Sequence, residues 1–114
     1  MQSMRNSALV RPRVVLSGGE AVFFPQGEAW ILGRTSPTTP KIDIDLTPYG
    51  GTEGGVSRRH VCIRRVVGGF TLEDLGSSNE TCLNSERISA GQQYSLAHGD
   101  HLSLGGVRCT FLVN

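Results

Sequence analysis

Three clusters of polar residues lie where the apolar runs of the chain stop. They are Gly33-Arg34, Ser57-Arg58-Arg59-His60 and Gly76-Ser77-Ser78-Asn79-Glu80-Thr81. Arginine presents a planar fork of donors that matches phosphate oxygens, hydroxyl groups add neutral donors, and asparagine offers both a donor and an acceptor to a peptide backbone. Residues of these types, brought together by turns, are suited to binding a phosphorylated peptide.

The same residues give little support for catalysis. Ser57 and His60 could form a hydrolase pair, but there is no nucleophile-elbow sequence and no acid placed to orient the histidine. The glycine-rich run 50–55 is not followed by the Lys-Ser/Thr of a nucleotide-binding loop, so it is interpreted as a flexible loop. We predict no catalytic residues and a protein that is not an enzyme.

Composition narrows the function further. A chain of 114 residues has the size of one domain. Its 11 Lys+Arg and 10 Asp+Glu give a net charge of +1 with few aromatic residues, which argues against nucleic-acid binding. No apolar run approaches the roughly 18 residues that span a bilayer, so membrane insertion is not expected.

The three cysteines are Cys62, Cys82 and Cys109. They are odd in number and lack a CxxC pair, so no disulfide, metal site or cofactor is expected. Free thiols of this kind favour a reducing, cytoplasmic compartment.

Short apolar runs separated by turn residues predict the elements that position the polar clusters. These runs are 13–16, 21–24, 29–32, 61–67, 70–73, 93–96, 101–104 and 108–113, and several of them alternate with a period of two. We therefore predict eight or more antiparallel strands in an all-β sandwich or barrel. Residues 35–56 are rich in proline and glycine and are predicted to be a long loop with room for one short strand at 42–46. Residues 1–11 show no periodicity and are predicted to be a disordered lead-in to a domain at 12–114.

Taken in order, these motifs resemble a forkhead-associated (FHA) domain over about Val14 to Val113. The resemblance rests on Gly-Arg, then Ser-x-x-His, then a Ser-Asn-x-Thr turn, then Asn84 and Gly99-Asp100. It implies an antiparallel β-sandwich of about eleven strands that binds phosphothreonine through loops at one end. By the same resemblance, the partner is a phosphothreonine-containing protein, and the chain is part of a larger adaptor protein in Ser/Thr-kinase signalling.

The resemblance also implies roles for individual residues. Arg34 and Ser57 would contact the phosphate, and Ser78 would bind the phosphate or shape its pocket. Asn79 would hydrogen-bond the ligand backbone, and Arg58 occupies a variable position that often touches the ligand. Structural support of the site would come from Gly33, His60 and Thr81.

Two departures from the family pattern bear on this hypothesis. Glu80 stands where the family has glycine, which is expected to place a carboxylate beside the anion site and to strain the turn if it needs a positive φ. Asn84-Ser85 stands where the family has Asn-Gly, and this change is expected to matter less. The alternative function is a phosphorylation-independent interaction or self-association module of the same fold.

Overall fold

The computed structural model describes residues 11–114. The predicted lead-in therefore lies outside the described residues except for Arg11, whose Nη2 donates a hydrogen bond to the carbonyl oxygen of Phe24 at 3.1 Å. Eleven strands and one 3-10 helix follow: β1 (Arg13–Leu16), β2 (Ala21–Phe23), β3 (Ala29–Gly33), β4 (Ile44–Asp45), η1 (Thr47–Tyr49), β5 (Val61–Val66), β6 (Gly69–Asp74), β7 (Thr81–Leu83), β8 (Glu86–Arg87), β9 (Gln93–Leu96), β10 (His101–Leu104) and β11 (Val107–Leu112). No helix long and apolar enough to cross a membrane occurs in this part of the chain.

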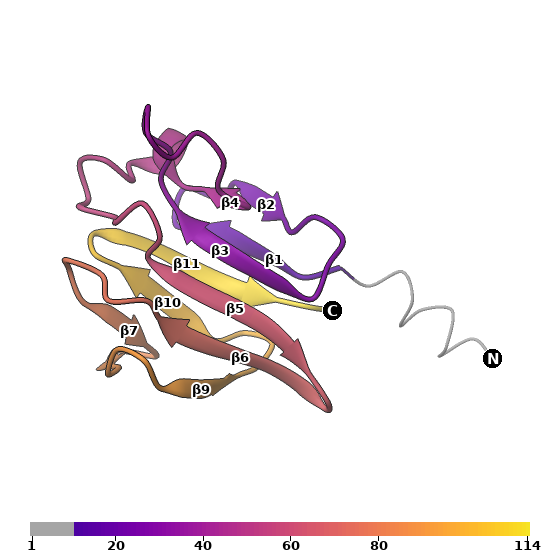
Figure 1. Ribbon diagram of the computed structural model, residues 1–114. Helices are drawn as coiled ribbons and strands as arrows, with labels where there is room; N and C mark the ends of the chain where they lie inside the picture. The colour runs from indigo at the N-terminus through magenta and orange to yellow at the C-terminus, as the bar shows by residue number, and fades with distance from the viewer. Residues whose placement is uncertain (1–10) are drawn as a thin grey trace.

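The strands form two sheets that pack face to face (Figure 1). One sheet has the order β2-β1-β11-β10-β7-β8, and the other has the order β4-β3-β5-β6-β9. Neighbouring strands are antiparallel with one exception, since β3 and β4 run parallel and pair Leu32 with Ile44. The predicted all-β sandwich is confirmed, while the expectation that every pairing is antiparallel is wrong at this pair.

Alternation along the strands explains the core between the sheets. In β1, for example, Val14 and Leu16 are buried while Arg13 and Val15 are partly exposed. Aromatic rings from both sheets meet at the centre of the core: the centroid of Phe111 lies 5.2 Å from that of Phe70 and 6.1 Å from that of Phe24, which in turn lies 5.1 Å from Trp30. Tilted and edge-to-face pairs at these separations stabilise a core beyond the area they bury.

The segment 35–56 is more structured than the sequence suggested. It contains β4, which lies within the predicted short strand at 42–46, and the helix η1. Ile44 and Leu46 are fully buried, and Val56 is nearly so. These three side chains attach the segment 35–56 to the core. The loop is therefore fixed at several points along its length.

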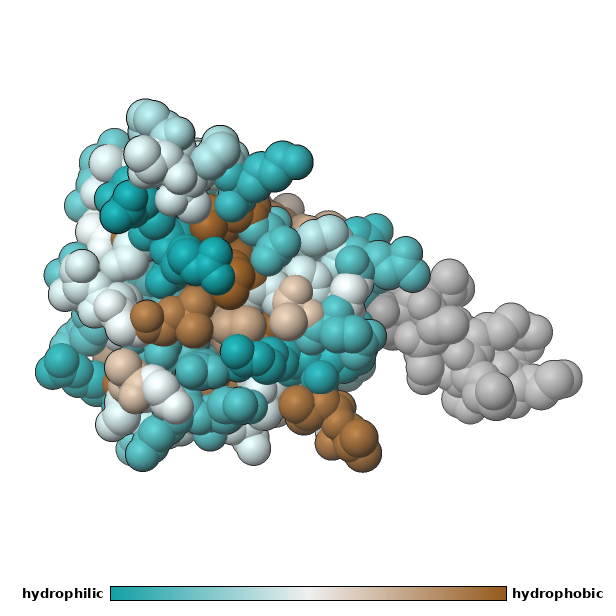
Figure 2. Space-filling view, viewed as in Figure 1, coloured by the Kyte–Doolittle hydropathy of each residue, from teal (hydrophilic) through white to brown (hydrophobic). Residues whose placement is uncertain are grey.

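The functional loops gather at one end of the sandwich. β3 ends at Gly33, β5 begins at Val61, β6 ends at Asp74 and β7 begins at Thr81, so the connections β3–β4, β4–β5 and β6–β7 meet at the end opposite the C-terminus (Figure 1). At the other end the β5–β6 hairpin carries the fully exposed Val67, and the hairpin tip forms the apolar projection at the lower right of Figure 2. The three polar clusters thus share one end of the molecule.

Candidate functional site

Arg34 is positioned by the end of β3 and by the β4–β5 loop. Its Nε donates to the carbonyl oxygen of Val56 at 2.7 Å, which fixes the guanidinium and leaves the two terminal nitrogens free of this bond. Gly33 precedes it, and a Cβ at that position would overlap the carbonyl oxygen of Arg58 and lie 2.8 Å from that of Ser57. Only glycine therefore allows the β4–β5 loop to approach the end of β3 so closely.

His60 joins the β4–β5 loop to the strands on either side of it. Its Nδ1 accepts the backbone N–H of Ser57 at 3.0 Å, its own N–H donates to the carbonyl oxygen of Leu32, and its carbonyl oxygen accepts the N–H of Leu75. The side chain is fully buried, and burial lowers its pKa although the charge of Asp74 acts in the opposite direction. The imidazole is therefore neutral, and with Nδ1 as the acceptor the proton lies on Nε2, for which residues 11–114 supply no partner.

Asp74 organises the β6–β7 loop. Its carboxylate accepts the backbone N–H groups of Gly76 at 2.7 Å and Ser77 at 2.9 Å, and the hydroxyl groups of Ser77 at 2.6 Å and Thr81 at 2.5 Å. Burial opposes its ionisation, but these hydrogen bonds outweigh burial and lower the pKa of Asp74. Both ends of the loop are therefore held by one buried carboxylate.

Two hydrogen bonds connect the β6–β7 loop to the β4–β5 loop. The hydroxyl oxygen of Ser57 accepts the backbone N–H of Ser78 at 2.9 Å. The side-chain amide of Asn79 donates to the carbonyl oxygen of Gly55 at 2.8 Å. Residue 55 has φ +73°, and a Cβ there would overlap Nδ2 of Asn79, so glycine is required both for the turn and for this contact.

These contacts enclose a shallow cavity of about 630 Å³. The structure brings together on its wall all five residues predicted to bind the ligand, namely Arg34, Ser57, Arg58, Ser78 and Asn79. The charged residues that line it are Arg34, Arg58 and Arg59, with no carboxylate among the lining residues. Within residues 11–114, no carboxylate lies within 4.0 Å of these guanidinium groups. The cavity is therefore a local cationic site on a chain whose net charge is only +1.

The supporting residues predicted from the sequence lie outside the cavity wall but touch the loops that form it. Gly33 packs on the β4–β5 loop, His60 closes that loop, and Thr81 is buried against Asp74. The residues predicted to bind the ligand left out Thr39, Thr52 and Arg59, which line the wall, although Arg59 stands in one of the polar clusters. They also left out the buried Asp74, which holds the β6–β7 loop. Asp74 could have been found, because an aspartate two residues before a Gly-Ser turn is well placed to accept its N–H groups. Thr39 and Thr52 lie in irregular segments that carry no such signal.

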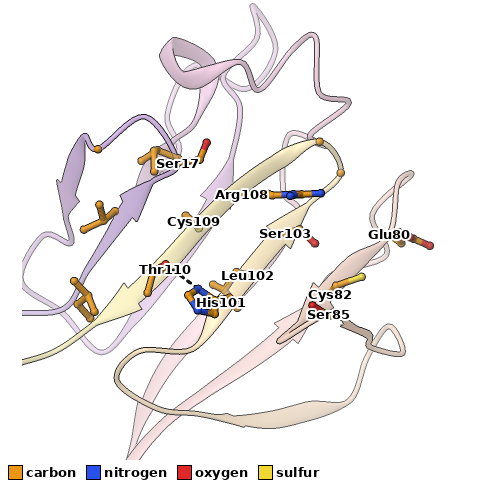
Figure 3. A pocket seen from close by; sticks show the side chains of 16 residues that line it. Ser17, Glu80, Cys82, Ser85, His101, Leu102, Ser103, Arg108, Cys109 and Thr110 are labelled. Carbon is orange, nitrogen blue, oxygen red and sulfur yellow. Dashed lines mark hydrogen bonds between the residues drawn. The ribbon is translucent and has the colours of Figure 1, made fainter.

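The expectation that the carboxylate of Glu80 lies beside the anion site is wrong. Its side chain is absent from the wall of the cationic cavity and lies instead at the edge of a second cavity, on the outer face of the six-stranded sheet, where Cys82 and Ser103 also lie (Figure 3). Its carboxylate lies 3.5 Å from Nη1 of Arg87. Glu80 also lacks a positive φ; the non-glycine residues among 11–114 that have one are Asn84 (51°) and Ser85 (71°). The departure that carries backbone strain is therefore Asn84-Ser85 in place of Asn-Gly, which was expected to matter less than Glu80.

Comparison with known proteins agrees with this arrangement. A sequence model of the FHA domain matches residues 30–105. The chain belongs to the FHA domain family. It is 37% identical over 82 residues to Protein FraH of Nostoc sp. and 38% identical over 53 residues to an FHA domain-containing protein of Arabidopsis thaliana. These matches cover 71% and 46% of this chain but only 28% and 14% of the two relatives, so the chain spans a minor part of the length of each.

Solved structures, FHA domains among them, have the same fold. A domain from a structural and functional analysis of phosphothreonine-dependent FHA domain interactions is 27% identical, with a TM-score of 0.69 over 91% of this chain and 97% of that one. Mycobacterium tuberculosis EmbR, solved with a low-affinity phosphopeptide, is 26% identical with a TM-score of 0.73 over 92% of this chain and 24% of that one. The N-terminal FHA domain of Saccharomyces cerevisiae Rad53p, solved with a phosphothreonine peptide, has a TM-score of 0.73 over 91% of this chain and 94% of that one, at 21% identity.

Proposed function

We propose that this FHA domain binds a phosphothreonine-containing segment of a partner protein in the cationic cavity. The observation that carries the proposal is the cavity wall itself, where Arg34, Arg58 and Arg59 converge without a lining carboxylate. A phosphate ester carries about −1.5 to −2 charges and three strong acceptor oxygens at neutral pH, and arginine is the side chain best suited to bind them. Two structural relatives support threonine phosphate as the ligand: a 27% identical domain from an analysis of phosphothreonine-dependent FHA domain interactions, and the 26% identical EmbR, solved with a phosphopeptide.

The hydrogen bonds within the site leave suitable groups free for such a ligand. Because the oxygen of Ser57 accepts the N–H of Ser78, its own hydroxyl proton can be donated to a phosphate oxygen. The Nε of Arg34 is occupied by Val56, so its terminal nitrogens would meet the phosphate. The amide of Asn79 uses one N–H on Gly55 and keeps its carbonyl oxygen and second N–H for a peptide backbone.

In this proposal the domain acts as a binding module and performs no reaction of its own. It would be one part of a longer cytoplasmic protein that recruits the product of a Ser/Thr kinase, since this chain matches only 28% and 14% of the length of the two relatives. The supporting residues Gly33, His60 and Thr81 would act by holding the loops in place. No metal ion or cofactor is needed for such binding.

The test is a screen with peptide libraries that hold either phosphothreonine or threonine at a fixed central position, followed by calorimetric titration of matched pairs. We expect measurable binding only to the phosphorylated member, and loss of most affinity in Arg34→Ala, because hydrogen bonds to charged groups contribute about 1.5–3 kcal/mol each. Arg34→Lys is the matched control for charge, and it should recover affinity only in part because it lacks the fork and the Nε bond to Val56. Equal binding of the two peptides would instead support the phosphorylation-independent interaction module.

A further inference from the structure

The β3–β4 loop presents a threonine at the tip of a tight turn beside the cavity. Ser36 and Thr39 pair through two backbone hydrogen bonds, of 2.9 and 3.0 Å, so that Pro37 and Thr38 form the tip. Thr38 is exposed, and its hydroxyl oxygen lies 3.0 Å from Nη1 of Arg58, which lines the cavity. A hydroxyl that a modifying enzyme can reach is thus already hydrogen-bonded to an arginine of the binding site.

We propose that Thr38 is a phosphorylation site, and that its phosphate binds Arg58 and blocks the protein's own peptide cavity. The co-reactants are ATP and a Ser/Thr kinase. Oγ1 of Thr38 forms a new bond to the γ-phosphorus, the bond from that phosphorus to the β–γ bridging oxygen breaks, ADP leaves, and the hydroxyl proton is released. The inference rests on the proposed function, because the blocked ligand is the phosphothreonine peptide.

The neighbouring hydroxyl groups are less suitable. The hydroxyl oxygen of Ser36 accepts the N–H of Thr39 at 3.1 Å and stabilises the turn. Thr39 is half-buried and lines the cavity, so its hydroxyl is less accessible than that of Thr38. Thr52 is exposed on the cavity wall, but it has no hydrogen bond to any of the three arginines. Thr38 alone among these four combines exposure with a direct contact to a cationic side chain of the site.

Phosphorylation would strengthen the existing contact between Thr38 and Arg58, and the new phosphate would compete with the peptide for the cavity. A neutral hydroxyl on a guanidinium becomes a phosphate on a guanidinium, and charge-assisted hydrogen bonds of that kind are about twice as strong as neutral ones. The phosphate is tethered to its site, so its effective concentration is on the order of millimolar. If the tethered phosphate binds the cavity with a Kd about tenfold below that concentration, the Kd of any competing peptide rises by about tenfold.

The experiment uses the full chain with phosphothreonine encoded at position 38, compared with the unmodified chain by calorimetric titration of a phosphothreonine peptide. We expect at least a tenfold rise in Kd. The matched control carries phosphothreonine at position 26, an exposed glutamine in the β2–β3 connection at the other end of β3 from the cavity, and it should bind like the unmodified chain. Equal binding by all three proteins would overturn the inference while leaving the proposed function intact.

A second readout does not depend on peptide binding. Phosphorus NMR titration of the protein phosphorylated at Thr38 should show a lower second pKa of the phosphate than in the same protein carrying Arg58→Gln, because a nearby guanidinium favours the dianion. In the protein with phosphothreonine at position 26, Arg58→Gln should leave the second pKa of the phosphate unchanged. If the two Thr38 phosphoproteins titrate together, the phosphate does not contact Arg58 and the inference fails. If the unmodified chain binds no phosphopeptide, the proposed function fails, whatever this titration shows.

Discussion

The hydroxyl oxygen of Ser57 accepts the backbone N–H of Ser78 at 2.9 Å, and this contact joins the β4–β5 loop to the β6–β7 loop across 21 residues of sequence. In the proposed complex the same hydroxyl group would donate its proton to the phosphate. Ser57 would thus bind the ligand and also hold together two of the loops that surround it. The two roles predict different consequences for substitution.

Ser57→Ala should weaken phosphopeptide binding by about tenfold or more, because a hydrogen bond to a charged group contributes roughly 1.5–3 kcal/mol and the Ser78 N–H loses its acceptor. Ser57→Thr is the matched control, since it keeps the hydroxyl and should retain most of the affinity. Calorimetric titration measures both, and amide exchange of Ser78 should become faster in the alanine variant alone. Parent-like affinity in Ser57→Ala would remove this residue from the proposed phosphate site.

Burial of His60 predicts a pH dependence of stability. Its folded pKa lies below the ordinary value of 6.5, so as the pH falls below about 6.5 the unfolded chain takes up a proton that the folded protein does not. The free energy of unfolding should therefore fall with pH from about 6.5 down to the folded pKa, by at most about 1.4 kcal/mol per pH unit for this one proton. Above pH 6.5 both states are neutral at this position and the effect disappears.

Urea unfolding between pH 5 and 8 measures this dependence, and His60→Asn should be less stable than the parent at neutral pH with a shallower slope below 6.5. Nitrogen-15 NMR of the imidazole tests the same point without a variant. A His60 ring that titrates at or above 6.5 in the folded protein would contradict the prediction.

The sequence predicted most strands because alternation over four or more residues is a visible signal, as in 101–104 and 61–67. It missed β7 and β8, since three and two residues are too few to show alternation and both residues of β8 are exposed. The parallel pairing of β3 with β4 could not be derived either, because the direction of pairing is set by the path of the long connection between them.

For the candidate site, too, one part could be predicted from the sequence and another could not. The ordered motifs carried the resemblance to the FHA family, and that resemblance named Arg34, Ser57, Arg58, Ser78 and Asn79, all of which the structure places on one cavity. The orientation of Glu80 was not predictable from its position beside Asn79. Glu80 leads into β7, where the side chain of Thr81 points into the core and that of Glu80 is exposed near Arg87. Adjacent residues in extended backbone face opposite sides, so proximity in sequence did not mean proximity to the anion.

The turn between β7 and β8 offers a route to higher stability. Asn84 and Ser85 both have positive φ, of 51° and 71°, as a two-residue hairpin turn of this kind requires. The side chain of Asn84 accepts the N–H of His101 and donates to Asp100, whereas residues 11–114 supply no hydrogen bond to the side chain of Ser85. Ser85→Gly should remove about 1–2 kcal/mol of left-handed strain and lose about 0.4–1 kcal/mol through the greater entropy of the unfolded chain.

We therefore expect Ser85→Gly to raise the melting temperature by a few degrees, which calorimetry can measure. Glu80→Gly is the matched control, because it makes the same kind of change where φ is not positive, and it should lower the melting temperature. A gain in stability from Glu80→Gly with none from Ser85→Gly would contradict this placement of the strain. Phosphopeptide affinity should be nearly unchanged in Ser85→Gly, since residue 85 lies outside the cavity wall.

Glu80→Gln should leave phosphopeptide affinity nearly unchanged at low and at moderate salt. The carboxylate lies at the edge of the second cavity and 3.5 Å from Arg87, and both side chains are more than half exposed, so water and counter-ions screen its field over about 10 Å at 0.1 M salt. A carboxylate on the cavity wall should behave differently. Thr52→Glu places one there on an exposed residue, and it should weaken binding at low salt by an amount that shrinks as salt rises. Titrations of the parent and both variants with a phosphopeptide at two ionic strengths measure both effects. Tighter binding by Glu80→Gln at low salt would mean that this side chain turns toward the phosphate when the ligand binds.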